Sequence, residues 1–141
     1  MDEDFGVAID STRSIVVENN IYNYGRSRKR YTAWLTVDGK AVSMISYLDG
    51  GSEYDVPMLC DIEVKKENRG NALGVTFVKL LEEHVIGGTL YTSGHYTPEG
   101  FRSLSDSLPL APHAVEAGEK PSQQFRSMGF VADWDNLWLE N

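Results

Sequence analysis

The stretch that most constrains this chain is residues 58–85, MLCDIEVKKENRGNALGVTFVKLLEEHV, which predicts a strand, a loop and a helix in succession. Residues 58–64 suit a short strand, residues 65–73 form a charged segment containing glycine, and residues 74–85 have apolar side chains at helical spacing. The N–H groups of a helix's first turn have no acceptor inside the helix, and the helix dipole adds positive potential there. A strand that enters a helix through such a loop is therefore suited to binding an anion.

A tight hairpin is predicted upstream of this stretch. Residues 31–37, YTAWLTV, and residues 40–48, KAVSMISYL, are rich in β-branched and aromatic residues, and Asp38-Gly39 joins them. Glycine accepts the positive φ that a type I′ turn needs, so Asp-Gly between two such runs indicates antiparallel strands. Residues 5–17 are predicted to form one long or bulged strand before this hairpin.

The order of elements predicts the fold class. Downstream of the helix we expect, in order, a helix stop at Gly87-Gly88, a strand over 90–93, a helix over 97–108, a loop over 110–122, helical turns over 122–128, and a strand pair over 130–132 and 137–140. Strands followed by helix, strand, helix and strand pair indicate one α/β (α+β) domain over residues 1–141. Its central sheet is expected to be mixed but mostly antiparallel, with flanking helices.

Composition excludes several classes of function. The chain has 141 residues and a net charge of −8, which opposes general binding to nucleic acid or to anionic membranes and favours cationic partners. No stretch reaches the ~18 apolar residues of a membrane span, and the acidic start MDEDFGVAID lacks the basic region of a secretory signal. The single cysteine, Cys60, excludes an internal disulfide. We therefore expect a cytoplasmic protein without nucleic-acid or membrane partners.

The loop at residues 69–74, RGNALG, is neither a Walker loop nor a Rossmann fingerprint, because no Gly-Lys-Ser/Thr follows and no G-x-G-x-x-G is present. It resembles the acyl-CoA loop of the GNAT superfamily of N-acetyltransferases, whose pattern is [Q/R]-x-x-G-x-[G/A]. Near the C-terminus, residues 124–130, QFRSMGF, resemble the family's F-Y-E-K-L-G-F element, and residues 135–139 match its closing strand. The resemblance runs from about residue 31 to the C-terminus.

The resemblance implies a GNAT-like sheet in which the strand before the loop splays from its neighbour and pairs with the pantetheine arm of acetyl-CoA. Loop amides would hold the pyrophosphate, and acetyl would pass directly to a primary amine on a small molecule or peptide. Family members often form homodimers, so a homodimer is one expected assembly. The cofactor-binding residues implied are Ile62, Glu63, Val64, Arg69, Gly70, Asn71, Ala72, Leu73, Gly74 and Phe125.

Direct acetyl transfer needs a base for the ammonium proton and an acid for the leaving thiolate. Strand alternation places Asp61 and Glu63 on one face, where partial burial would raise a carboxyl pKa and favour a role as base. A solvent-facing acidic pair is the other reading. Phe125 stands where the family often has a tyrosine that acts as general acid toward the departing thiolate. Tyr96 is therefore a candidate proton donor, and the alternative role of Tyr96 is structural hydrogen bonding.

Other features leave alternatives open. Ala72 replaces a usual glycine and Phe125 cannot donate a proton, so a GNAT-shaped binding protein with little catalysis, or a purely structural domain, competes with an enzyme. The basic cluster Arg26, Arg28, Lys29 and Arg30 is interpreted as a solvated loop, with a cofactor phosphate or an acidic partner as alternatives. The histidines and Cys60 lack metal-ligand spacing, so no metal site is predicted.

Overall fold

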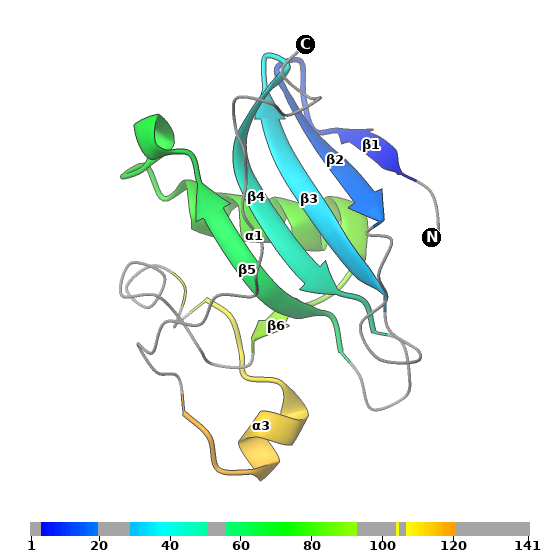
Figure 1. Ribbon diagram of the computed structural model, residues 1–141, viewed down its shortest axis with the longest axis vertical. Helices are drawn as coiled ribbons and strands as arrows, with labels where there is room; N and C mark the ends of the chain where they lie inside the picture. The colour runs from blue at the N-terminus through cyan, green and yellow to red at the C-terminus, as the bar shows by residue number, and fades with distance from the viewer. Residues whose placement is uncertain (1–3, 20–28, 51–55, 93–103, 105–106, 121–141) are drawn as a thin grey trace.

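The computed structural model describes residues 4–19, 29–50, 56–92, 104 and 107–120. Its centre is a six-stranded sheet whose strands follow the order of the chain. All neighbouring strands are antiparallel except β5 and β6, which run parallel (Figure 1). The strands are β1 (Phe5–Ala8), β2 (Arg13–Asn19), β3 (Arg30–Val37), β4 (Lys40–Leu48), β5 (Met58–Val64) and β6 (Tyr91–Thr92). The mixed, mostly antiparallel α+β architecture predicted from the sequence is confirmed.

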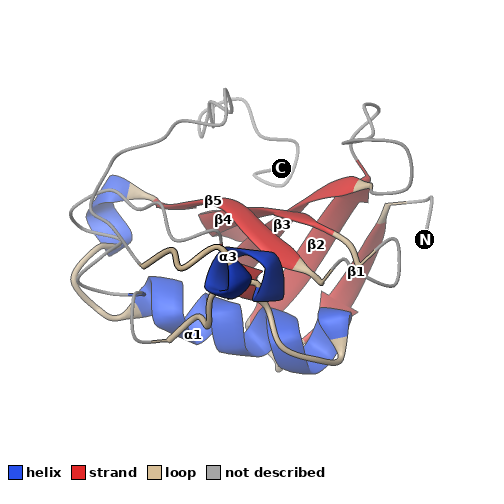
Figure 2. Cartoon of the chain, turned by 90° about the horizontal axis from the view of Figure 1, so that it is seen from below, coloured by secondary structure: helices blue, strands red, loops and turns tan. Residues whose placement is uncertain are grey.

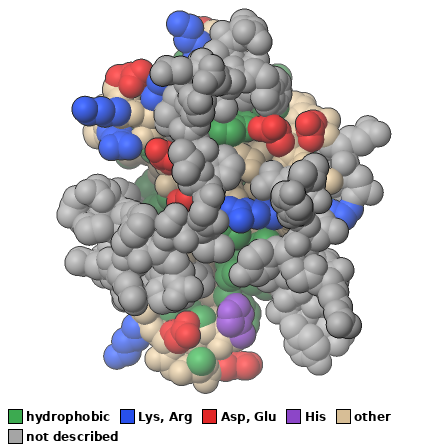
Figure 3. Space-filling view, in the orientation of Figure 1, with side chains coloured by type: hydrophobic (Ala, Val, Ile, Leu, Met, Phe, Trp, Pro, Cys, Tyr) green, Lys and Arg blue, Asp and Glu red, His purple; other side chains and the backbone are tan. Residues whose placement is uncertain are grey.

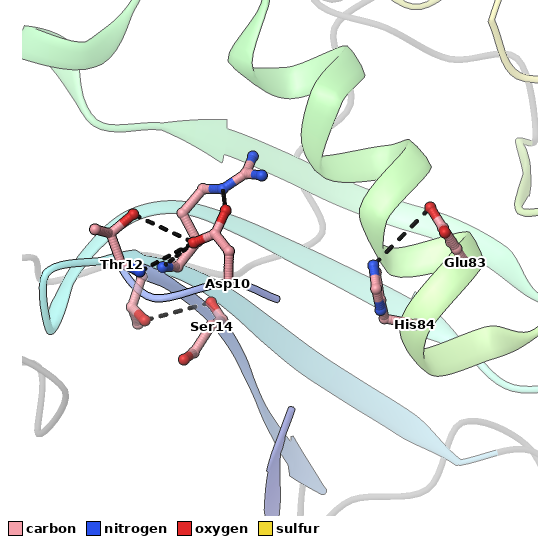
Figure 4. A network of polar contacts seen from close by, with 7 residues as sticks. Asp10, Thr12, Ser14, Glu83 and His84 are labelled. Carbon is pink, nitrogen blue, oxygen red and sulfur yellow. Dashed lines mark hydrogen bonds and ion pairs between the residues drawn. The ribbon is translucent and has the colours of Figure 1, made fainter. Parts of the chain in front are cut away.

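The prediction of one strand over residues 5–17 is wrong, because a turn divides this segment into β1 and β2. The Asp10 carboxylate accepts hydrogen bonds from the backbone N–H groups of Thr12, at 3.0 Å, and Arg13, at 2.8 Å. The Arg13 Nε also donates to it at 2.8 Å (Figure 4). An aspartate that binds the backbone two and three residues ahead stabilises a turn in place of extended chain.

The hairpin predicted around Asp38-Gly39 is confirmed. Both residues have positive φ, 51° for Asp38 and 81° for Gly39, as a type I′ turn requires. β3 and β4 pair from Val37 opposite Lys40 to Arg30 opposite Leu48, and the register shifts by one residue between Leu35 and Thr36. This register decides which side chains of the sheet share a face.

The predicted helix begins one residue earlier than expected, as α1 (Leu73–Leu81), and continues as a wider π-helical segment, η2 (Glu82–Ile86). Gly87 ends it with φ 73° and donates its N–H to the Glu82 carbonyl at 2.8 Å, which confirms the predicted stop. The loop before α1 contains a short 3₁₀ turn, η1 (Lys66–Asn68).

The core lies between α1 and one face of the sheet (Figure 2). Phe77 of α1 is fully buried. It belongs to one apolar cluster with side chains from β2, β3 and β4, including Ile15, Ala33, Leu35 and Ile45. Burial of this apolar stripe, rather than intrinsic helix propensity, stabilises a helix this short.

The loop predicted over residues 110–122 is partly wrong, because α3 (Pro112–Glu116) forms within it (Figure 1). The proline that suggested a loop occupies the first turn of the helix, where its missing N–H costs nothing. Ala114 is buried and anchors this turn. Before α3, Leu108 donates its N–H to the Leu104 carbonyl at 3.1 Å, a helical contact where the predicted 97–108 helix was expected to end. The helical turns and strand pair predicted over residues 122–140 lie outside the described residues.

Candidate functional site

β5 presents different side chains to the two faces of the sheet. A Cβ added to Gly74 of α1 would lie 3.5 Å from Ile62 Cδ1 and 3.9 Å from Val64 Cγ2, so these two side chains face the helix. Strand alternation then directs Asp61 and Glu63 to the opposite face. The predicted sharing of one face by the two carboxylates is confirmed.

Asp61 is half-buried on this second face. Burial raises the pKa of its carboxyl group above the usual range, and the nearby Glu63 carboxylate pushes this pKa in the same direction. The Ile62 N–H, which donates to Asp61 Oδ1 at 2.9 Å, and the positive charge of Arg30 oppose that rise. The raised pKa expected from the sequence is confirmed in direction, and it suits a carboxylate that must accept a proton.

A polar row crosses four strands and ends at Asp61. The register places Glu18 of β2 opposite Thr32 of β3, Thr32 opposite Ser46 of β4, and Ser46 opposite Asp61 of β5. Thr32 and Ser46 are buried, whereas the two acids at the ends of the row are partly exposed. Buried hydroxyls in a sheet face need hydrogen-bond partners, and Ser46 has one in Arg30. The sequence does not reveal this row, because an uninterrupted register from the Asp38-Gly39 turn would pair Thr32 with Ile45, and only the shift between Leu35 and Thr36 brings Ser46 opposite Thr32.

Arg30 and Trp34 extend the polar contacts of this face. The Arg30 Nε donates to the Ser46 hydroxyl at 2.8 Å, and the Trp34 indole N–H donates to the Glu18 carboxylate. The interpretation of Arg30 as part of a solvated loop is therefore wrong, because Arg30 opens β3 and is partly buried there. The side of the molecule away from α1 shows acidic, basic and hydrophobic side chains next to one another (Figure 3).

The outer edge of β5 meets β6 over a short distance. Parallel pairing is recorded for Met58 with Tyr91 and for Leu59 with Thr92, and within the described part of the chain it extends no further. The pairing between β4 and β5 shifts after Ser46, which gives β5 an extra residue at this point.

Beyond this bulge the backbone of β5 has a defined orientation. The Lys65 N–H donates to the Val42 carbonyl of β4 at 2.9 Å, and the Glu63 carbonyl accepts from the Ser43 hydroxyl at 2.9 Å. Because backbone groups alternate sides along an antiparallel strand, the polar groups of Ile62 and Val64 point away from β4. They therefore point to the side on which β6 begins.

The loop after β5 closes back onto the strand and then enters α1. The Arg69 Nε donates to the Val64 carbonyl at 2.8 Å, which fastens the loop to the strand end. Gly70 has φ 91° and Ala72 has φ 54°. Ala72 is the N-cap of α1 and makes no side-chain capping bond.

The start of α1 leaves amide donors at the loop. The Ala72 carbonyl accepts the Thr76 N–H at 3.0 Å, the first turn of the helix. The N–H groups of Leu73, Gly74 and Val75 precede that bond and have no acceptor within the helix. No acidic residue lies in this first turn, so nothing in the turn itself repels an anion.

A hollow of about 340 Å³ lies beside the same loop, on the β4 side. It is bounded by the β3–β4 turn and by the loop, and its lining mixes apolar, amide and charged groups. The lining residues are Val37, Lys40, Ala41, Val42, Lys65, Glu67, Asn68, Asn71 and Leu73. Lys65 Nζ lies 3.7 Å from Glu67 Oε1, so part of its positive charge is already compensated.

The structure thus brings the predicted cofactor residues Ile62 to Val64 and Arg69 to Gly74 together at one end of the sheet. The predicted residues Tyr96 and Phe125 lie outside the described residues. His84 lies at the end of the long helix with its Nε2 3.9 Å from Glu83 Oε2 (Figure 4). Across the part of the chain that the structure describes, no group of three or more His, Cys, Asp or Glu side chains could hold a metal ion.

No family model, no curated protein and no solved structure matches this chain. Within the described ranges, none of the helices has the length and apolar character needed to cross a membrane.

Proposed function

We propose that this chain is an acyl-CoA-dependent N-acetyltransferase of the GNAT type, which moves an acetyl group from acetyl-CoA to a primary amine. The single observation that supports it most is the course of β5. This strand has recorded pairing with its parallel neighbour at Met58 and Leu59, and it then leads through the loop into the amide-rich start of α1. A ligand with an extended amide-bearing arm and a pyrophosphate fits this arrangement. The arm would pair with the outer edge of β5, and the pyrophosphate would meet the amides at the start of α1.

The loop residues would hold the phosphates. The amides of Leu73, Gly74 and Val75 offer donors with the favourable end of the helix dipole behind them. Arg69 adds a positive charge and is fastened by its Nε to the Val64 carbonyl, so its remaining N–H groups can meet an anion. Residue 74 lies so close to β5 that an added Cβ would already contact Ile62 and Val64, so the site accepts only a small residue.

The outward backbone of β5 would receive the pantetheine arm. The Ile62 N–H is already donated to Asp61, and the Val64 carbonyl already accepts from Arg69. The Ile62 carbonyl and the Val64 N–H point the same way and would pair with amides of the ligand. This leaves one acceptor and one donor for an added strand.

Asp61 is proposed as the base. Acetyl-CoA supplies a thioester whose acetyl group passes to nitrogen as the C–S bond breaks and the C–N bond forms. Asp61, with its raised pKa, accepts the proton that the ammonium group must lose, and Glu63 adds negative charge that attracts a cationic acceptor. Tyr96 remains the proposed donor of a proton to the departing thiolate.

Calorimetric titration with acetyl-CoA tests the proposal. Gly74→Leu should abolish binding, because a large side chain would force α1 away from Ile62 and Val64. Gly74→Ala should retain it, because its Cβ would make only ordinary contacts. Gly88→Leu is the matched control, since a side chain there enters open space at the far end of the helix. Absence of binding at millimolar acetyl-CoA by the unmodified protein would exclude this function.

A binding protein of the same shape without turnover is the second candidate, and the conformation of Ala72 favours it. A methyl group at φ 54° stands beside the amides that would hold the phosphates, where glycine would leave more room. Acetyl-CoA binding without acetylation across a broad panel of amines would support this candidate. Turnover of any amine in that panel would eliminate it.

A further inference from the structure

Arg30 has no role in the proposed reaction so far, yet it is tied to the element that carries the proposed base. Its Nε donates to the Ser46 hydroxyl at 2.8 Å. Ser46 is fully buried and stands directly opposite Asp61 on the same face of the sheet. The hydrogen bond therefore holds a guanidinium group beside the cross-strand neighbour of Asp61.

Arg30 acts on Asp61 through its charge and not through an ion pair. These two described residues form no ion pair within 4.0 Å, although the Arg30 charge acts on the Asp61 carboxylate. A direct bidentate pair would occupy both carboxylate oxygens and oppose proton uptake. A cation held at a distance favours the ionised carboxylate and leaves an oxygen available for a proton.

In the described part of the molecule, the charged groups that act on Asp61 are Glu63 and Arg30. Glu63 is on the same strand, Glu18 lies at the other end of the polar row, and β4 contributes the uncharged Ser46. Arg30 of β3 supplies the opposing charge. Burial and Glu63 both favour the neutral acid, so Arg30 counteracts them.

We propose that Arg30, held in place by its hydrogen bond to Ser46, is a positioning residue that favours the ionised form of Asp61, the form that can take a proton from the amine. The catalytic part of this inference, proton transfer from the amine to Asp61, rests on the proposed function. The electrostatic coupling between Arg30 and Asp61 is a property of the folded chain and can be measured without any substrate.

Carboxyl ¹³C NMR titration of protein labelled at aspartate measures this coupling, with Asp61→Asn to assign the resonance. Arg30→Met should raise the pKa of Asp61, because removal of a positive charge destabilises the carboxylate. Arg30→Lys should restore a titration near that of the unmodified protein. Lys79→Met, which removes an exposed cation on α1 across the sheet, should change nothing.

Ser46→Ala provides a second variant in case Arg30→Met does not fold. It keeps the charge but removes the hydroxyl that holds the guanidinium, and it should raise the pKa of Asp61 by less than the loss of Arg30. An Asp61 titration that is unchanged in both Arg30→Met and Ser46→Ala would overturn the inference. A shift as large in Arg30→Lys as in Arg30→Met would overturn it too, because charge would then not be the cause.

The kinetic readout separates this inference from the proposed function. In Arg30→Met the acid limb of kcat/KM for the amine should move to higher pH, with KM for acetyl-CoA unchanged. A purely structural role of Arg30 would lower activity equally at all pH values, which contradicts the inference. If the unmodified protein acetylates no amine but the NMR shift is present, the proposed function fails while the coupling stands.

Discussion

Two aspartates, Asp10 in the β1–β2 turn and Asp61 on β5, show how differently two regions of this molecule treat the same side chain. Asp10 is exposed and accepts hydrogen bonds from two backbone N–H groups and from Arg13, which lower its pKa to about 2. Asp61 is half-buried, accepts one backbone N–H, and has a raised pKa because burial outweighs that bond. The Asp10 carboxylate stabilises a turn, whereas the raised pKa of Asp61 favours uptake of a proton.

The same contrast holds for the surrounding backbone. In the hairpin region, positive φ falls on Asp38 and Gly39, two residue types that tolerate it. In the loop before α1, positive φ falls on Gly70 and also on Ala72, which does not tolerate it well. Strain combined with an uncapped helix start is more typical of ligand sites than of turns that only connect strands.

The largest expected effect comes from removing the proposed base. Asp61→Asn should lower kcat for acetyl transfer by about 10²- to 10⁴-fold, because general base catalysis contributes about that much. Binding of acetyl-CoA, measured by calorimetry, should remain unchanged. Asp10→Asn is the matched variant from the other region, and it should leave kcat unaltered. Equal losses in the two variants would remove the distinction between a structural and a chemical aspartate.

Phe77→Ala tests whether the loop depends on the core beneath it. Phe77 is fully buried between α1 and the sheet, so we expect a loss of about 3–5 kcal/mol in the free energy of unfolding, measured by urea denaturation. Hydrogen exchange should increase more in α1 than in the β2–β3 pair. An equal increase in both would show that the two regions unfold as one cooperative unit.

Ala72→Gly should stabilise the protein by about 1 kcal/mol, because glycine adopts φ 54° without steric cost and part of that gain is offset by its larger unfolded-state entropy. It should also strengthen acetyl-CoA binding by removing the methyl group beside the amides. Asp38→Ala provides the opposite change and should destabilise the β3–β4 turn. Stability that does not rise in Ala72→Gly would show that the positive φ there is not strained.

The smallest effect is expected from the pH dependence of Asp10. Its folded-state pKa of about 2 lies below the ordinary value of 3.8, so its stabilising contribution is present above pH 4 and is lost as pH falls through about 2. Melting temperatures of the unmodified protein and of Asp10→Asn should differ at pH 5 and converge near pH 2. A difference that persists at pH 2 would assign the effect to packing rather than to charge.

Local sequence signals predicted much of the hairpin and helix arrangement. Asp38-Gly39 identified its turn because a two-residue type I′ connection depends on those two residues alone. Gly87 identified the end of the helix for a similar reason. Two signals were misread: Asp10 turns the chain within an expected strand, and Pro112 opens a helix within an expected loop. In each case the residue type is compatible with both local conformations, and neighbouring contacts select one.

The sequence by itself determined the strand–loop–helix stretch at residues 58–85, with its glycines, its apolar helical stripe and its paired carboxylates. Period and residue type specify these features, and they depend on few distant contacts. Tertiary structure alone decided that Ser46 lies opposite Asp61, that Arg30 donates to Ser46, and that Ala72 takes positive φ. Cross-strand register and burial set these relations, and both arise only when segments far apart in the chain pack together.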